Sequence, residues 1–383
     1  MRNRQIPRGL RDLLPEEVKV MRSMEKKAAR LFSSYAYEEV MTPTFEFLEV
    51  IEAGRGSRRE DLFLFMDREG GILSLRPEVT GSIARMASTH LHDADFPRRL
   101  YYTANVFRHV QPQLAQYREF RQTGVELLGA AGVWADAEVV NIAVKLLERM
   151  GLERFKISIN QLPIFNSILD DSGMSAEDRA LVRKLVEDKD LVELSCLLEE
   201  LQIEDDLKDT IAALPVLHGG LDVIHRIPYV EKNRNASTAV EELIKLYDAL
   251  KIYGVTSNIV VDMGVLRNLD YYTGLVFEGY SADLGYGLLG GGRYDNLLGQ
   301  FGLTCPATGF ALHMDRLALV LKCRDKEQDR YLVGGNNYPA MIEKAEQLRE
   351  QGFIVEMDMG EHSLAQLEKR IIGQNNWTLV YLD

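Results

Sequence analysis

The residues best suited to chemistry lie in one stretch, residues 106–129, which reads VFRHVQPQLAQYREFRQTGVELLG. Its pattern predicts two amphipathic strands joined by a loop. The two-residue period of a strand places a cation, an amide and a carboxylate on one face of the second strand, in the set Arg118, Phe120, Gln122, Gly124 and Glu126. Because a glycine leaves room against the backbone, this face suits the floor of a pocket that binds a small zwitterion. A solvated strand face is the alternative interpretation, and this segment alone supports both equally.

A second candidate group is the carboxylate of Glu78, which stands at the opening of a predicted helix over residues 79–87. A carboxylate at that place stabilises the helix dipole by a few tenths to about 1 kcal/mol, which alone could explain it. As a functional group it would accept hydrogen bonds from the ammonium group of a ligand, with Thr80 beside it.

A third candidate is the segment RNLDYYTG at residues 267–274, which combines an arginine, an acid, two tyrosines and a turn glycine between two strands. Adjacent tyrosines are usually one core residue and one surface residue. Here Tyr271 and Tyr272 could instead wall an aromatic ring and offer a hydroxyl group for hydrogen bonding.

No pattern in the chain indicates a cofactor, a metal or a covalent catalyst. The segment GGGRYD at residues 290–295 lacks the Gly-Lys-Ser/Thr ending of a phosphate-binding P-loop. Gly285, Gly287 and Gly290 match the spacing of a dinucleotide fingerprint but lack its strand-turn-helix context, so close strand packing is the better interpretation. Apart from one His-x-His pair the histidines lack metal-ligand spacing, and no Ser-His-Asp or Cys-His arrangement stands out. We expect no cofactor.

The composition is that of an ordinary soluble globular protein, with 383 residues of which 46% are hydrophobic and 27% charged. A net charge of −13 argues against a nonspecific nucleic-acid binder, which would need a broad basic field, although a local basic groove stays compatible with it. No apolar run is long enough to span a bilayer, and no basic-then-apolar leader opens the chain. Cys196, Cys305 and Cys323 are scattered and odd in number, which indicates a reducing cytoplasm.

The periodicity of the apolar residues predicts an α+β fold with two domains. Residues 1–325 form a core of strands and helices, interrupted at about 163–252 by a helical insertion rich in Leu, Glu, Asp and Lys. A charged linker, RDKEQDR, follows at residues 324–330. Residues 326–383 alternate strand, helix, strand, helix and strand, which predicts a small α/β unit.

Several segments, in this order, resemble histidyl-tRNA synthetase: PRGLRDLLPEE at Pro7, MTPTFE at Met41, LRPEVT at Leu75, FRHVQPQLAQYREFRQTGVELLG at Phe107, RNLDYYTG at Arg267, GGGRYDNLLGQFG at Gly290 and GFALHMDRLALVL at Gly309. The resemblance covers nearly all of the first 325 residues. It implies the class II aminoacyl-tRNA synthetase fold, an antiparallel sheet flanked by helices, and a dimer formed through the first motif. It also implies which residues hold histidine: Glu78, Thr80, Arg108, Gln122, Glu126, Arg267, Tyr271 and Tyr272.

The chemistry of these residues fits histidine. Glu78, with its polar neighbours, can take the ammonium group, and Arg108 or Arg267 can take the carboxylate. Glu126 and a tyrosine hydroxyl can bind the two ring nitrogens, which suits histidine better than other side chains.

The chain departs from the synthetase pattern where ATP and tRNA would bind. Val110 stands where the family has an acid near the adenine amino group, and His313 stands where a small glycine leaves room for the nucleotide. Uncharged residues replace several cations of the second motif: Gln111, Leu114 and Gln116. Each lost charge-assisted contact could cost about 1.5–3 kcal/mol. The short tail also replaces the larger anticodon-binding domain of the synthetase.

An intact amino-acid half beside a dismantled nucleotide half resembles the synthetase-like regulatory subunits of ATP phosphoribosyltransferase. The resemblance implies a noncatalytic, cytoplasmic protein that binds L-histidine and assembles with short-form catalytic subunits, commonly as a hetero-octamer, in the first step of histidine biosynthesis. It would be required for their activity and for feedback control. An active histidyl-tRNA synthetase of unusual sequence, and a histidine-binding or scaffold protein with another partner, are the alternatives.

Overall fold

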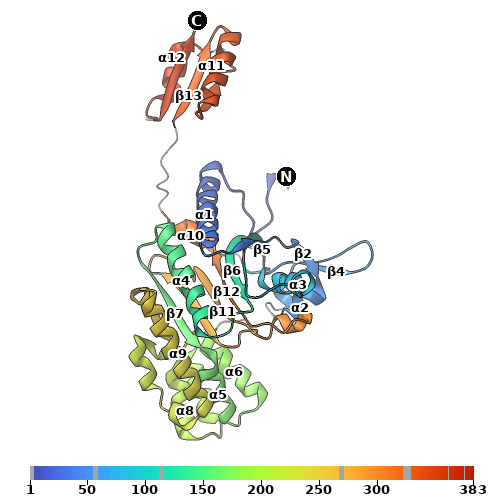
Figure 1. Ribbon diagram of the computed structural model, residues 1–383, viewed down its shortest axis with the longest axis vertical. Coiled ribbons are helices and arrows are strands. Elements are labelled where there is room, and N and C mark those ends of the chain that lie inside the picture. The colour runs from blue at the N-terminus through green and yellow to red at the C-terminus, as the bar shows by residue number, and fades with distance from the viewer. Residues whose placement is uncertain are drawn as a thin grey trace. The chain divides into compact units, whose positions relative to one another are not determined.

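The computed structural model describes residues 4–54, 59–111, 116–266, 271–321, 329–360, 362–374 and 376–383. The chain divides into two structural units, Met1–Leu321 and Lys322–Asp383. The predicted α+β architecture is confirmed, since the sheet with its flanking helices, the helical insertion and the small α/β unit are all present (Figure 1). No helix among the described residues is long and apolar enough to cross a membrane.

The larger unit is built on a nine-stranded sheet of order β1-β5-β6-β12-β11-β10-β7-β9-β8. Neighbouring strands are antiparallel except in the pairs β1–β5 and β7–β9, which are parallel. The strands are β1 (Glu38–Glu39), β5 (Arg98–Phe107), β6 (Glu119–Leu128), β7 (Phe155–Gln161), β8 (His218–Gly219), β9 (Ile259–Asp262), β10 (Leu275–Ser281), β11 (Leu289–Arg293) and β12 (Ala307–His313). The two strands predicted within residues 106–129 are therefore the end of β5 and the whole of β6.

Three helices, α1 (Pro15–Ser34), α4 (Val133–Met150) and α9 (Arg234–Ile252), cover one face of this sheet. Helix α4 packs between α1 and α9 and against β6, β11 and β12. Its apolar side is fully buried because small and branched residues recur at helical spacing: Ala137, Val140, Ala143 and Leu147. The helix ends at Gly151, whose φ of +89° favours glycine.

Strand β6 serves the core on one face and a polar site on the other. Val125 and Leu127 are buried in the main hydrophobic core. Gln122 and Glu126 alternate with them along the strand, so they point to the opposite face. There Glu126 meets the first residue of α3 (Thr80–His90), whose hydroxyl donates it a hydrogen bond of 2.7 Å.

The space beside Gly124 is filled by protein, which corrects the expectation of an open place for a ligand. A Cβ atom at Gly124 would lie 2.2 Å from the carbonyl oxygen of Phe310 on β12. It would also lie 2.9 Å from the hydroxyl oxygen of Tyr102 on β5. The glycine therefore allows strand β12 and a tyrosine ring to come close, and the pocket lies beyond that ring.

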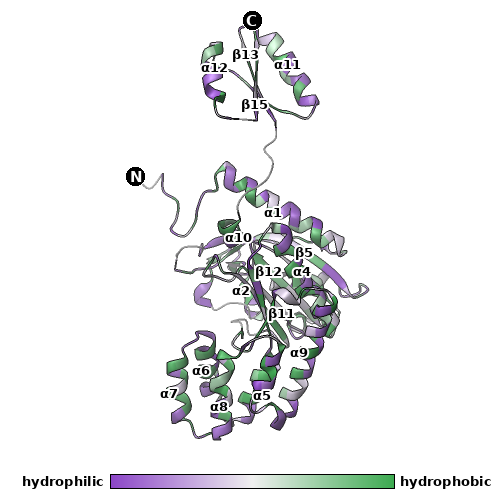
Figure 2. Ribbon diagram, turned by 90° about the vertical axis from the view of Figure 1, so that its left-hand side faces the viewer, coloured by the Kyte–Doolittle hydropathy of each residue, from purple (hydrophilic) through white to green (hydrophobic). Residues whose placement is uncertain are grey.

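The helical insertion lies between β7 and β9 and consists of α5 (Leu162–Asp171), α6 (Ala176–Glu187), α7 (Leu191–Glu200), α8 (Asp205–Ala213) and α9. Figure 2 shows hydrophilic and hydrophobic residues on each of α6, α7 and α8. Val182, Leu194 and Ile211 from these helices join the main hydrophobic core. The insertion also supplies β8, which pairs with β9 and was not predicted.

A second, antiparallel sheet of order β2-β4-β3 exposes apolar side chains. Its strands are β2 (Phe45–Phe47), β3 (Leu64–Met66) and β4 (Ile72–Leu75). Phe45, Phe47 and Met66 are 50%, 54% and 71% exposed. Apolar groups gathered in this way are typical of an interaction surface.

The smaller unit is a three-stranded parallel sheet of order β14-β13-β15. Its elements are β13 (Arg330–Gly335), α11 (Tyr338–Glu350), β14 (Ile354–Met357), α12 (Leu364–Ile371) and β15 (Trp377–Leu382). Figure 2 shows α11 and α12 on opposite sides of the sheet. Its own small core contains Val333, Met341, Ala345 and Leu348.

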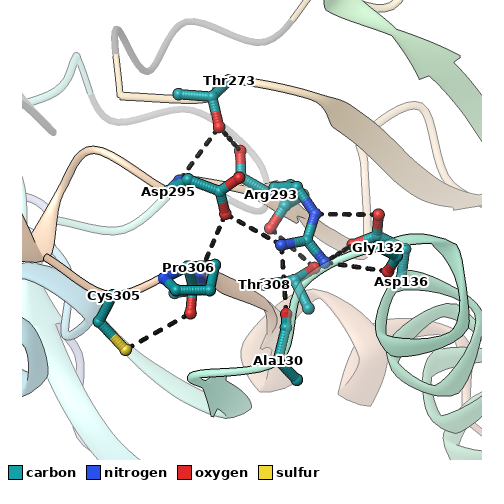
Figure 3. A network of polar contacts seen from close by, with 11 residues as sticks. Ala130, Gly132, Asp136, Thr273, Arg293, Asp295, Cys305, Pro306 and Thr308 are labelled. Atoms are coloured by element: carbon teal, nitrogen blue, oxygen red, sulfur yellow. Dashed lines mark hydrogen bonds and ion pairs between the residues drawn. The ribbon is translucent and has the colours of Figure 1, made fainter. Parts of the chain in front are cut away.

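A buried arginine, Arg293, links strand β11 to the start of helix α4 (Figure 3). Its guanidinium group forms an ion pair of 2.9 Å with Asp136 and another of 2.9 Å with Asp295. The backbone N–H of Asp295 donates to the Thr273 hydroxyl at 3.0 Å. Since Thr273 directly follows Tyr271 and Tyr272, the network fixes the position of the tyrosine pair.

We predict that Arg293→Met destabilises the larger unit by about 3–5 kcal/mol, because it leaves the Asp136 carboxylate buried without its partner. The side chains of this pair are only 9% and 5% exposed. The matched control is Arg154→Met, which removes the exposed Arg154–Asp283 pair and should change stability by less than about 1 kcal/mol. Urea denaturation gives both free energies of unfolding, and equal effects would contradict the structural role of Arg293.

Candidate functional site

A cavity of about 380 Å³ opens on the polar face of β6 and β12. All of the predicted histidine-binding residues that the structure describes line it: Glu78, Thr80, Arg108, Gln122, Glu126, Tyr271 and Tyr272. Arg267 belongs to residues 267–270, outside the described part of the chain. The residues that flank this stretch, Leu266 and Tyr271, both line the cavity.

The carboxylate of Glu126 lies at the buried end of the cavity. Its side chain is held by two hydroxyl donors, Thr80 at 2.7 Å to one oxygen and Tyr294 to the other. Gly309 on β12 is opposite Glu126 in the strand register. A Cβ atom at Gly309 would lie 2.0 Å from Glu126 Oε2, so only glycine leaves room for the carboxylate here.

Burial raises the pKa of Glu126 to about 8, although the hydrogen bonds from Tyr294 and Thr80 act in the opposite direction. The nearby carboxyl group of Glu78 adds to the increase. Burial also raises the pKa of Glu78, against the effect of its hydrogen bond from the Gly81 backbone. At neutral pH Glu126 is therefore mostly protonated.

The two carboxyl oxygens of Glu78 have different surroundings. One oxygen accepts a 2.8 Å hydrogen bond from the Gly81 N–H in the first turn of α3, where a carboxylate also favours the helix dipole. The other oxygen, Oε2, is buried and has no hydrogen-bond partner among the described residues. That oxygen is available to a ligand in the cavity.

Two more buried polar atoms of the cavity wall lack a partner in the described part of the chain, Gln122 Oε1 and the hydroxyl oxygen of Tyr102. Buried polar atoms in native proteins are almost always hydrogen-bonded. With Glu78 Oε2, they form a set of three acceptors at one cavity. Such a set fits a group with several N–H donors.

Tyrosines form an aromatic wall of the cavity. The ring centroids of Tyr271 and Tyr272 are 4.8 Å apart, and Tyr294 meets Tyr271 edge-on at 5.6 Å. Burial raises the pKa of Tyr271 and of Tyr294 well above the ordinary value, so their hydroxyl groups stay protonated donors. The wall is thus apolar on its faces and offers hydrogen bonds at its tips.

A smaller hollow of about 110 Å³ adjoins the cavity at Arg108, His313 and Arg316, which line both. The rings of His313 and Phe120 stack there at 4.9 Å with an interplanar angle of 19°. Asp315 is buried and accepts hydrogen bonds from Arg11 at 2.7 Å and from the Arg121 backbone at 2.6 Å. Phe120 and Asp315, which a nucleotide could otherwise contact, are therefore already bonded to or stacked on other residues of the protein.

Several residues that line the cavity were not predicted from the sequence. Tyr294 donates to Glu126, yet it sits in a glycine-rich segment that sequence analysis treats as packing. Tyr102 pairs with Gly124 in the strand register, so the two-residue period of β5 could have found it. Glu187 and Lys189 come from the helical insertion, and no local signal connects them to the core. In the described residues, no group of three or more His, Cys, Asp or Glu side chains could hold a metal ion.

Comparison with known proteins identifies the family. The family model described as histidyl-tRNA synthetase matches residues 9–317. The ATP phosphoribosyltransferase regulatory subunit of Moorella thermoacetica is 40% identical over 357 residues, which are 92% of each chain. The chain belongs to the ATP phosphoribosyltransferase regulatory subunits. Members of this family are named as regulatory rather than catalytic subunits, as the sequence predicted.

Solved structures support the fold of this regulatory-subunit family. A crystal structure from Bacillus halodurans, described as an ATP phosphoribosyltransferase regulatory subunit/histidyl-tRNA synthetase, has a TM-score of 0.89 and 30% identity and covers 99% of this chain and 98% of that one. Histidyl-tRNA synthetase from Nostoc sp. PCC 7120 has a TM-score of 0.83 at 21% identity, covering 100% and 92%. The predicted class II synthetase-like fold is confirmed.

The raised pKa of Glu126 predicts a pH-dependent effect of Glu126→Gln on the stability of the empty protein. The unfolded carboxyl group loses its proton near its ordinary pKa of 4.5, while the folded one keeps it up to about pH 8. The contribution of the Glu126 carboxyl group to the free energy of unfolding is therefore complete below pH 4.5. It is lost as the pH rises towards 8, at up to about 1.4 kcal/mol per pH unit. We expect Glu126→Gln to be more stabilising, or less destabilising, at pH 8.5 than at pH 5.5.

Thermal unfolding of both proteins at the two pH values measures this difference. Glu177→Gln, on an exposed carboxylate of α6, is the control for general charge effects. A difference between Glu126→Gln and the native protein that does not change with pH would contradict the raised pKa.

Proposed function

We propose that the cavity binds L-histidine and that its occupancy controls a separate, short-form ATP phosphoribosyltransferase catalytic subunit. In this proposal the chain has no catalytic residues and no cofactor. It is required for the activity and the feedback inhibition of its partner in the first step of histidine biosynthesis, in the cytoplasm. The observation that carries the proposal is the set of unpartnered buried acceptors beside the carboxyl group of Glu126.

The acceptors match the ammonium group of an amino acid. An ammonium group has three N–H donors and no acceptor. Glu78 Oε2, Gln122 Oε1 and the hydroxyl oxygen of Tyr102 supply three acceptors at the same cavity. The positive charge would also stabilise the ionised form of Glu78, whose pKa is raised by burial.

Glu126 supports recognition of the imidazole ring. Thr80 and Tyr294 hold its carboxyl group in place, and a ring N–H can bond to a remaining lone pair of the oxygens. The tyrosine wall supplies a hydroxyl group for the second ring nitrogen and an apolar face for the ring carbons. A hydrocarbon side chain would offer no hydrogen bond to the remaining lone pairs of Glu126, which favours histidine.

The neighbouring hollow supports a regulatory role over the synthetase alternative. Aromatic side chains bind nucleic-acid bases by stacking. The ring of Phe120 is already stacked on His313, and the side chain of Val110 offers no acceptor at the adjoining wall. An ATP molecule would have to displace a protein ring before it could stack on Phe120.

Regulation requires that histidine binds two states of the assembly with different affinity, on the order of 1–3 kcal/mol apart. The proposed partners are the catalytic subunit and a second copy of this chain, within a hetero-octamer. The exposed apolar side chains of the β2-β4-β3 sheet, which follow the first motif at Met41, support the dimer. The net charge of −13 argues against nucleic acid as a partner.

We predict that titration calorimetry detects histidine binding and that Glu126→Ala weakens it by more than about 2 kcal/mol, because a ring N–H loses its buried acceptor. Glu119→Ala is the matched control, since Glu119 stands on the same strand but bonds to Asn105 outside the cavity. Equal affinities of native protein and Glu126→Ala would show that histidine does not use this pocket.

We predict that the chain raises the turnover of a short-form catalytic subunit and that added histidine lowers the turnover of the mixture. The catalytic subunit alone sets the baseline. The chain alone should show no histidine-dependent ATP–pyrophosphate exchange. Exchange activity, or a turnover that stays at the baseline, would favour the synthetase or the scaffold alternative.

A further inference from the structure

The turn between helices α6 and α7 of the insertion reaches the histidine cavity. Glu187, the last residue of α6, and Lys189, in the turn, line the same cavity as Glu78 and Glu126. The insertion is therefore part of the site and not only an addition to the sheet edge. No residue of the insertion was assigned to the site by the sequence.

Lys189 adopts a backbone conformation that glycine would adopt with less strain. Its φ is +56°, in the left-handed region. The Lys189 N–H bonds to the Val186 carbonyl and the Asp190 N–H to the Leu185 carbonyl, which is the Schellman end of a helix. The same chain uses Gly151 after α4 for such an end. A lysine at this position costs more strain than a glycine would, which motivates a search for a use of its side chain.

The side chain of Lys189 is placed for an anionic group at the open end of the cavity. Glu126 and Glu78 are buried at the other end, whereas Lys189 is exposed. Among the described residues Lys189 forms no ion pair, unlike Lys232 in the same insertion, which pairs with Asp206. A ligand whose ring and ammonium group lie at the acidic end presents its carboxylate towards the cations of the cavity wall, where Lys189 adds to Arg108, the cation that the sequence assigns to the carboxylate.

We propose that Lys189 binds the carboxylate of the amino acid in the cavity, and that this contact ties the helical insertion to the ligand. The inference rests on the proposed histidine site and adds a residue and a regulatory element to it. The insertion shares a core with the sheet, and its helix α9 packs on α4, so the contact links the ligand to the helices that cover the sheet. A ligand without a carboxylate fills the pocket but does not engage the insertion.

Titration calorimetry with two ligands tests the proposal on the full chain. Histamine has the ring and the ammonium group of histidine but no carboxylate. We expect Lys189→Met to weaken the affinity for histidine about fivefold or more and to change the affinity for histamine by less than about twofold. Lys184→Met, which removes an exposed cation one turn earlier on α6, is the matched control and should change neither affinity.

The variant Lys189→Gly distinguishes the effect of removing the cation from the effect of changing the backbone conformation of the turn. It relieves the strain at φ +56°, so the melting temperature should rise, yet histidine should be weakened as much as in Lys189→Met. Equal weakening of both ligands would assign Lys189 a role in shaping the pocket and overturn the carboxylate contact. Unchanged histidine affinity in both variants would overturn it as well.

The outcome also separates this inference from the proposed function. Loss of histidine binding in Glu126→Ala but not in the Lys189 variants would leave the histidine site standing and remove Lys189 from it. Absence of histidine binding to the native chain would overturn both.

Discussion

The site depends on keeping one carboxyl group, that of Glu126, inside a sheet where water does not reach it. Burial disfavours the charged form, and two hydroxyl donors from distant segments, Thr80 and Tyr294, offset part of this cost. The group fits only because Gly309 on the neighbouring strand has no side chain. The Glu126 side chain can therefore be accommodated only when three features form at the same time: the pairing of β6 with β12, the position of α3 and the position of the segment after β11.

The two adjoining hollows differ in whether the protein itself supplies hydrogen-bond partners for their polar groups. In the larger cavity Glu78 and Gln122 each keep an oxygen without a partner among the described residues. In the smaller one the protein satisfies its own groups, since Asp315 accepts two hydrogen bonds and Phe120 stacks on His313. Unpaired buried acceptors are costly without a ligand, so they are a stronger sign of binding than the size of the cavity.

The sequence predicted the parts of the fold that depend on local pattern. Alternation along β6 identified Gln122 and Glu126, and the five elements of the C-terminal unit were found in their order. Features set by long-range contacts were missed or misread. Gly124 could not reveal that Tyr102 fills its space, and nothing local to the glycine-rich segment indicated that Tyr294 donates to Glu126.

The close approach of Gly309 to Glu126 limits how the selectivity of this pocket can drift during evolution. Any replacement at Gly309 would push a backbone strand away from the carboxyl group, so the floor can change only by a large, simultaneous rearrangement. The rim has no such restriction, because the exposed turn at Lys189 can exchange a side chain without moving a strand. Relatives that diverge in what they sense are therefore expected to differ first at the insertion, while the floor stays the same.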